Sequence, residues 1–534
     1  MYTLSIFLKG ELADTFGRKI VVLTSSVIFV IGAIMVCVAQ NFDILVAGRF
    51  VLGLGVGAAS MCIPVYISEI APQEVRGSLV TCINLAITIG QFISCVVAGI
   101  FSTSPNGWRY MFGIAAIPAV AQFIGLELFI PESPRWLISR KMYRDAQIAL
   151  IMLRPEGTDV HSEFKEMRET SDKGMVTQEG DGEVEKTALW ASSIFLRPLL
   201  LGCTLQACQQ LLGINTLMYY SATILKLAGF SNSLAIWLSA LSALFNVLGT
   251  VLGFYLVDIV GRRPLTLYSL FLSVFALGLI CLSFMYAQTS SVHLTHIAGY
   301  DDTCQRYNWC FDCLQVEDCA MCESVLDDGS SRFSCISHES SKYSSNLMSM
   351  DQKEIGATNH TLISPLTGLQ CASVYSDSCP SASTKGAGWM LLTSLCLYLL
   401  FFSPGMGPMP WCVNSEIYPT KVRGMGVSLA TSVNWLCNLI MSLTFLTTIM
   451  SIGDSATFLL YAATNAILFI FFFRFLPETK GLSLESVASL FSDAEWGRAA
   501  RYEEMSADVV LVKCIGIVSV VYIASTIYFS ELPT

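Results

Sequence analysis

The stretch SEIAPQEVRG at residues 68–77 returns as SEIYPTKVRG at residues 415–424, and this pair decides the fold. Two shorter motifs repeat in the same order, at residues 14–19 and 258–263 (DTFGRK and DIVGRR) and at residues 131–133 and 477–479 (PES and PET). Three matches in the same order indicate an internal duplication. The second copy is longer by about the length of the polar segment 289–385, so that segment is interpreted as an insertion.

The regions between these motifs are strongly apolar. Hydrophobic residues make up 53% of the 534 residues and charged residues only 13%, against about 25% charged in soluble domains. Ten stretches are long enough to cross a membrane core of about 30 Å as helices. They cover residues 20–40, 44–67, 78–101, 110–131, 196–220, 232–257, 264–288, 386–411, 424–450 and 455–476. One such stretch alone could be a buried helix of a soluble protein, but ten predict an all-α membrane protein.

The charges of the short loops predict the orientation. Basic loops alternate with nearly uncharged loops around Asn41, Ser104 and Ser231. The basic loops are those that hold Arg18, Lys19, Arg76, Arg262, Arg263, Lys421 and Arg423. Because basic loops stay in the cytoplasm, we expect residues 138–194 inside and residues 289–385 outside the cell. The net charge of −10 gives no indication of nucleic-acid binding.

The cysteines of the inserted segment support an outside location. Eight of the chain's 19 cysteines lie there: Cys304, Cys310, Cys313, Cys319, Cys322, Cys335, Cys371 and Cys379. An even number of cysteines outside the cell predicts disulfides, and Asn359 begins a glycosylation sequon in the same segment. A zinc module is the alternative, since two Cys-x-x-Cys pairs have the spacing of zinc ligands.

The repeats divide the chain into halves. We expect a first half at residues 1–137, a linker with short helices at 138–194, a second half at 195–288 and 386–492, and a tail at 493–534. Two spans precede the second DxxGRR motif, whereas only 13 residues precede the first. The interpretation is therefore ten spans of a twelve-span design, without the first two helices. The apolar run 509–529 is open to three interpretations: a further span, a surface-lying segment or an aberrant reading frame.

The quoted motifs, with PESPRWL at residues 131–137, QQLLGIN at 209–215 and PETKG at 477–481, resemble the sugar porters of the major facilitator superfamily. The resemblance covers residues 10 to about 492. Within that family, FFSPGMGPMPW at residues 401–411 and the cysteine-rich insertion most resemble the proton-coupled myo-inositol transporters. The outer loop of those transporters is similar to a plexin-semaphorin-integrin module.

Amide side chains are the candidate solute ligands. A neutral polyol carries hydroxyls that both donate and accept, which matches the capacity of Asn and Gln, and an aromatic ring covers its C–H face. The resemblance implies a solute-binding role for Gln209, Gln210, Asn215, Asn246, Trp411, Asn434, Asn84 and Gln91. Asn84 and Ser403 depart from the residues typical of glucose transporters. The alternative role is hydrogen bonding between helices, worth about 0.6 kcal/mol each.

Two places in the spans are expected to break. The helix can end at Gly213, and the prolines between Pro404 and Pro410 cannot sustain a straight helix. The resemblance makes the second break an outer gate, with a static kink as the alternative.

Charges in equivalent places of the two halves are candidates for an inner gate. They are Asp14, Arg18, Glu69, Arg76, Asp258, Arg262, Glu416 and Arg423. Such pairs could bias an equilibrium of a few kcal/mol between two conformations. The alternative is that these charges only set the orientation of the chain in the membrane, with basic residues on the inside.

Arg49 is the candidate for proton coupling. It lies inside the span 44–67, where an unpaired arginine costs at least about 2.5 kcal/mol. In the proton-coupled sugar porters, which this chain resembles, an aspartate of the first helix pairs with the arginine of a Gly-Arg-Phe segment. The similar segment here is residues 48–50. Snorkelling to the outer surface is the alternative.

The function predicted from these features is secondary active transport of myo-inositol with protons, in the plasma membrane. The partners expected are a small neutral polyol or sugar, protons and the lipid bilayer, without cofactor or metal; the oligomeric state is not predicted. A hexose uniporter or proton-hexose symporter is the first alternative, and a non-transporting sensor or inactive truncated isoform the second. An enzyme is disfavoured, because the sequence offers no nucleophile with a base, no metal cluster and no phosphate loop.

Overall fold

A computed structural model describes residues 15–72, 76–154, 159–176, 193–227, 230–290, 383–418 and 422–481, with short segments between 293 and 375 and at 487 and 490–491. In this part of the chain, eight helical segments are long and apolar enough to cross a membrane. They are α2 (Arg18–Cys37), α3 (Phe42–Ile70), α4 (Arg76–Phe101), the consecutive α5 (Gly107–Ile114) and α6 (Ala116–Phe129), α14 (Asn232–Val260), α15 (Arg262–Ser290), α20 (Arg423–Ile452) and α21 (Asp454–Phe475).

The other two predicted spans are interrupted where the sequence indicates a break. The helix α11 (Ser193–Leu211) stops before Gly213, and α12 (Ile214–Tyr219) and α13 (Ser221–Leu227) follow. Gly213 has φ +80°, a left-handed conformation that ends the helix and that glycine adopts without strain. The helix α18 (Ser383–Phe402) ends at the turn of residues 403–408, and α19 (Met409–Glu416) follows that turn.

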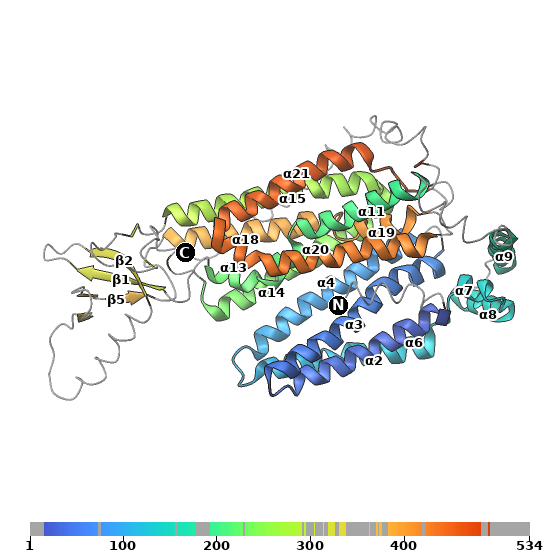
Figure 1. Ribbon diagram of the computed structural model, residues 1–534, viewed down its shortest axis with the longest axis horizontal. Helices are drawn as coiled ribbons and strands as arrows, with labels where there is room; N and C mark the ends of the chain where they lie inside the picture. The colour runs from blue at the N-terminus through green and yellow to red at the C-terminus, as the bar shows by residue number, and fades with distance from the viewer. Residues whose placement is uncertain are drawn as a thin grey trace.

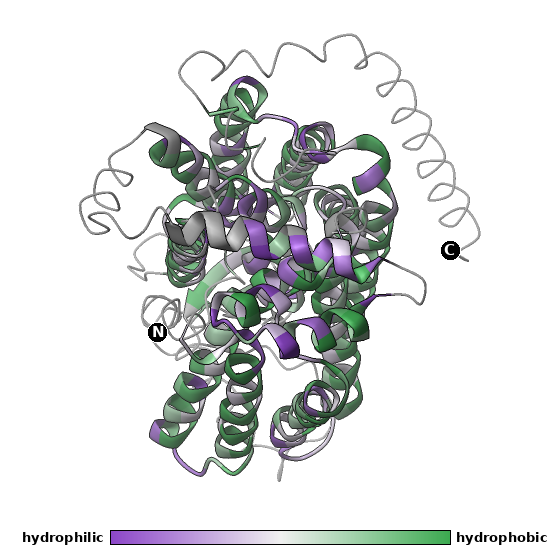
Figure 2. Ribbon diagram, turned by 90° about the vertical axis from the view of Figure 1, so that its right-hand side faces the viewer, coloured by the Kyte–Doolittle hydropathy of each residue, from purple (hydrophilic) through white to green (hydrophobic). Residues whose placement is uncertain are grey.

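The helices form two bundles that lie side by side. Figure 1 shows α2, α3, α4 and α6 in one bundle and α11 to α21 in the other. The long helices α4 and α14 pack against each other across the boundary. Large apolar side chains such as Ile117, Leu443 and Ile467 are exposed, and the helices in Figure 2 are hydrophobic over most of their length. An apolar outer surface of this extent is a surface for lipid.

The two ends of the bundle carry different structures. The short helices α7 (Pro134–Ser139), α8 (Tyr143–Leu153) and α9 (Val160–Val176) lie at one end, and the strands lie beyond the opposite end (Figure 1). In the larger sheet β1 (Cys319–Val325) lies between β2 (Ser331–Ser337) and β5 (Ser373–Tyr375), with both pairings antiparallel. The strands β3 (Leu362–Ile363) and β4 (Gln370–Cys371) form a second pair.

Disulfides hold the strand region. Cys304 bonds to Cys319 and Cys313 to Cys335, and Cys322 is also disulfide-bonded. Three of the four cysteines of the two Cys-x-x-Cys pairs, Cys313, Cys319 and Cys322, are thus held in disulfides and are not free as zinc ligands. Several predicted features lie outside the described residues: Asp14, Cys310, Asn359, Cys379, residues 509–529 and the side chains of Arg76 and Cys371.

Candidate solute site

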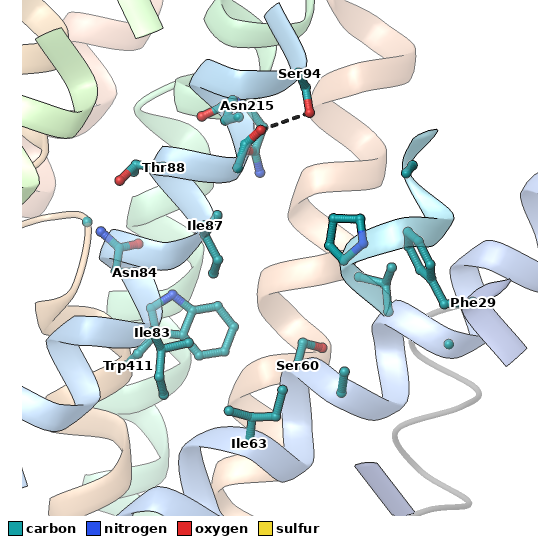
Figure 3. Close-up of a pocket in the computed structure, with 18 of the residues that line it drawn as sticks. Phe29, Ser60, Ile63, Ile83, Asn84, Ile87, Thr88, Ser94, Asn215 and Trp411 are labelled. Carbon is teal, nitrogen blue, oxygen red and sulfur yellow. Dashed lines mark hydrogen bonds between the residues drawn. The ribbon is translucent and has the colours of Figure 1, made fainter. Parts of the chain in front are cut away.

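A cavity of about 830 Å³ lies between the two bundles. Its lining includes all eight candidate solute ligands: Asn84 and Gln91 of α4, Gln209 and Gln210 of α11, Asn215 of α12, Asn246 of α14, Trp411 of α19 and Asn434 of α20. Figure 3 shows Asn84 and Trp411 on one side of the cavity and Ser60 and Ile63 of α3 on the other. Among the described lining residues none is ionisable, so the cavity suits a neutral solute.

Asn434 is the centre of a buried amide network. Its Nδ2 donates to Gln206 Oε1 at 2.8 Å and to Gln209 Oε1 at 2.9 Å, and its Oδ1 accepts from Gln210 Nε2 at 3.0 Å. Gln210 Oε1 in turn accepts from Asn215 Nδ2 at 2.9 Å. The network therefore joins α11, α12 and α20 and fixes the orientation of each amide.

The turn between α18 and α19 is part of the same network. Gln209 Nε2 donates to the carbonyls of Met406 (2.9 Å) and Gly407 (2.8 Å), which the break leaves available. A Cβ atom on Gly407 would lie 2.8 Å from Asn84 Nδ2, so glycine lets the turn approach the cavity wall.

A second contact joins the two halves at the cavity. Asn246 Nδ2 donates to Gln91 Oε1 at 3.2 Å, and Asn246 Oδ1 accepts from Ser403 Oγ at 2.5 Å. The Ser403 hydroxyl is therefore already in use, and a carboxylate at this position would place a charge beside Asn246, a residue of the cavity wall.

Four groups in the cavity keep free hydrogen-bonding capacity. Within the described residues, no hydrogen bond is formed by the Asn84 amide, Gln91 Nε2, Asn215 Oδ1 or Trp411 Nε1. Together they offer donors and acceptors from both halves to one cavity, which the indole of Trp411 also lines. This arrangement can hold a ring with several hydroxyls, since each hydroxyl can donate and accept.

The repeated motifs of the two halves carry the same ion-pair arrangement. In the first half Arg18 pairs with Glu69 at 3.1 Å, and Glu69 accepts from Ser133 Oγ at 2.5 Å. In the second half Arg262 pairs with Glu416 at 3.5 Å, and Glu416 accepts from Thr479 Oγ1 at 2.6 Å.

The remaining gate candidates are placed around these clusters. Asp258 pairs with Arg262 at 3.4 Å and accepts a hydrogen bond from Ser78 of the other half. Arg423 donates to the Tyr418 carbonyl at 3.3 Å, and Glu416, the partner that its own motif suggested, accepts from Arg262.

Two further glutamates, absent from the sequence-based candidates, hold the helix starts. Glu132 accepts from the backbone N–H groups of Arg18 (2.9 Å) and Lys19 (3.0 Å), where α2 begins. Glu478 accepts from Arg262 (3.0 Å) and Arg263 (2.9 Å), where α15 begins. A carboxylate at a helix N-terminus satisfies free donors and the helix dipole. In the sequence, the repeated PES and PET motifs, which contain Glu132 and Glu478, are the feature that indicates this shared role.

Comparison with known proteins shows the family to which the chain belongs. The family model described as "Sugar (and other) transporter" matches residues 3–301 and 353–491. The chain belongs to this family. This sugar transporter is 39% identical to the human proton myo-inositol cotransporter. The match covers 92% of the present chain and 76% of the human protein. The probable inositol transporter 2 of Arabidopsis thaliana is 34% identical over 90% and 80%.

A solved structure shows the same fold as this sugar transporter. The major facilitator superfamily proton:xylose symporter XylE, bound to 6-bromo-6-deoxy-D-glucose, gives a TM-score of 0.63 at 23% identity. The match covers 92% of this chain and 87% of XylE.

Replacing Glu478 by Gln in this sugar transporter is expected to lower the melting temperature. The amide leaves part of the α15 start without a charged acceptor, at a cost of about 1–3 kcal/mol. Thermal unfolding in detergent measures the effect. The control is Glu127→Gln, because the Glu127 side chain is 56% exposed. Equal melting temperatures for Glu478→Gln and the wild type would contradict the assigned role.

Proposed function

We propose that this protein is a secondary active transporter that moves myo-inositol together with protons by alternating access. The observation that carries the proposal is the uncharged, amide-lined cavity between two repeated halves, with Trp411 in its wall. The names of the relatives support the choice of solute, because inositol transporters recur among them at 34–39% identity.

The ion pairs at the inner end are proposed to act as the inner gate. They join the helix starts of α2 and α15 to Glu69 and Glu416, and the Ser78–Asp258 contact crosses between the halves. Breaking them would open the cavity to the cytoplasm. The end that carries α7 to α9 is then cytoplasmic, and the strand region lies outside a plasma membrane.

Arg49 is proposed to take part in proton coupling. Its guanidinium lies 4.6 Å from the centre of the Phe112 ring, and no carboxylate within the described residues pairs with it. We propose that its acidic partner lies outside the described residues and that protonation of this partner releases Arg49. The twelve-span interpretation of the sequence stays a prediction.

Uptake of labelled myo-inositol into proteoliposomes is expected to be faster with an inward proton gradient than without one. A protonophore should remove the difference, because it collapses the gradient that drives entry. D-Glucose at the same concentration is the solute control. Inositol uptake that does not depend on external pH would refute proton coupling and leave facilitated transport.

A hexose transporter is the second candidate. The galactose-proton symporter of Escherichia coli is 30% identical to this chain over 90% of its length. In the same assay, uptake of glucose or galactose that exceeds myo-inositol uptake would favour this candidate.

A further inference from the structure

Two buried polar side chains outside the cavity hold the break between α11 and α12. Tyr398 of α18 is 0% exposed, and its hydroxyl donates to the Leu212 carbonyl at 2.9 Å. Asn465 of α21 is also 0% exposed, and its Nδ2 donates to the Leu211 carbonyl at 2.9 Å. Two neighbouring helices thus satisfy consecutive carbonyls directly before Gly213.

Further contacts fix these two side chains. Asn465 Oδ1 accepts from Cys208 Sγ at 3.3 Å, and Asn465 Nδ2 also donates to the Tyr461 carbonyl at 2.8 Å. The ring of Tyr398 stacks on Phe402 with 5.9 Å between centroids.

The break itself lies against an aromatic wall. A Cβ atom on residue 213 would lie 3.1 Å from the Tyr461 ring. The chain therefore turns at Gly213 against side chains of α18 and α21. The angle between α11 and α12 depends on the contacts of Tyr398, Asn465 and Tyr461.

The two ends of the break carry solute-site amides. Gln210 lies just before it and Asn215 just after it, and the bond from Asn215 Nδ2 to Gln210 Oε1, 2.9 Å long, spans the break. In a lipid-embedded bundle, carbonyls freed from a helix must be satisfied within the protein. Loss of either donor would leave a carbonyl unsatisfied and allow α12 to shift.

We propose that Tyr398 and Asn465 are positioning residues, which hold α12 so that the free Oδ1 of Asn215 faces the solute. The effect on solute rests on the proposed function, whereas the effect on the break does not.

Hydrogen–deuterium exchange without solute tests the effect on the break. Tyr398→Phe and Asn465→Leu are expected to speed amide exchange at residues 211–219 at least about fivefold, with little change in α15. The matched control is Ser283→Ala, which removes a buried hydroxyl contact of 3.1 Å between α15 and α18. Unchanged exchange at residues 211–219, or equal acceleration throughout the second half, would overturn the proposal.

Equilibrium binding of labelled myo-inositol and D-glucose tests the effect on the site. Tyr398→Phe is expected to weaken binding of the solute that the wild type prefers about fivefold, with the number of sites unchanged. In an Asn215→Ala background the same substitution should cost little more. An equal loss in both backgrounds would refute positioning through Asn215. Wild-type protein that binds neither solute would refute the proposed function, while the exchange result still decides whether the break is held.

Discussion

Replacing Asn434 by Leu is expected to weaken solute binding by about a hundredfold. The Asn434 amide satisfies Gln206, Gln209 and Gln210 at once. Without Asn434 these amides lose the fixed orientation in which they meet the solute, and ordering them again on binding is expected to cost about 1–3 kcal/mol. A cost of 1.4 kcal/mol corresponds to a tenfold change in affinity. Equilibrium binding of labelled myo-inositol measures the loss.

The matched control for this prediction is Asn438→Leu. Asn438 lies one turn further along α20, is also buried, and is not among the lining residues of the cavity. Its Oδ1 accepts from Ser442 Oγ at 3.1 Å on its own helix, and its side chain also bonds Tyr219, at the end of α12 away from Asn215. We expect a change in affinity of less than about threefold. Equal losses for both variants would show that the network supports the fold and not the site.

Replacing Arg262 by Gln is expected to open the inner end of the second half. Its side chain is 9% exposed and lies 3.5 Å from Glu416 and 3.4 Å from Asp258. Removal of one partner from a buried ion pair costs about 3–5 kcal/mol, so the closed conformation should lose about a hundredfold or more in relative population.

Cys412 is a native reporter for this opening. Its thiol is 1% exposed and lies 3.7 Å from Glu416 Oε1. Its labelling by an impermeant maleimide, followed by mass spectrometry in inside-out vesicles, should be at least about tenfold faster in Arg262→Gln. Labelling at the wild-type rate would contradict the gate.

The first half supplies the control for this prediction. Arg18→Gln removes the equivalent charge from a more exposed pair, with side chains 12% and 16% exposed. Solvent can replace the lost partner there, so a smaller effect on Cys412 is expected.

Much of the fold follows from the sequence because the membrane imposes simple rules. Apolar length predicts the spans, and both interrupted helices were expected at Gly213 and at the prolines between Pro404 and Pro410. The amides that line the cavity also stand out in the sequence, because polar side chains such as Gln209 and Asn434 are costly in an apolar span.

The partners of these residues are not readable in the same way. Glu416 lies in one motif with Arg423, yet the structure pairs it with Arg262, which packing of α15 against α19 brings close. Gln206 joins the network because it lies one turn before Gln210, on the same face of α11. It lies outside the motif at residues 209–215, so the motif does not reveal it. Pairing across helices depends on how they pack, and a linear motif does not encode this.

The hydrogen bonds among Asn434, Gln206, Gln209 and Gln210 have a consequence for the unloaded carrier. Without solute, each buried polar group that has no partner costs about 1–3 kcal/mol. In this protein the four amides form hydrogen bonds with one another when no solute is bound. The unloaded conformation is therefore spared the cost of leaving four buried amides without partners.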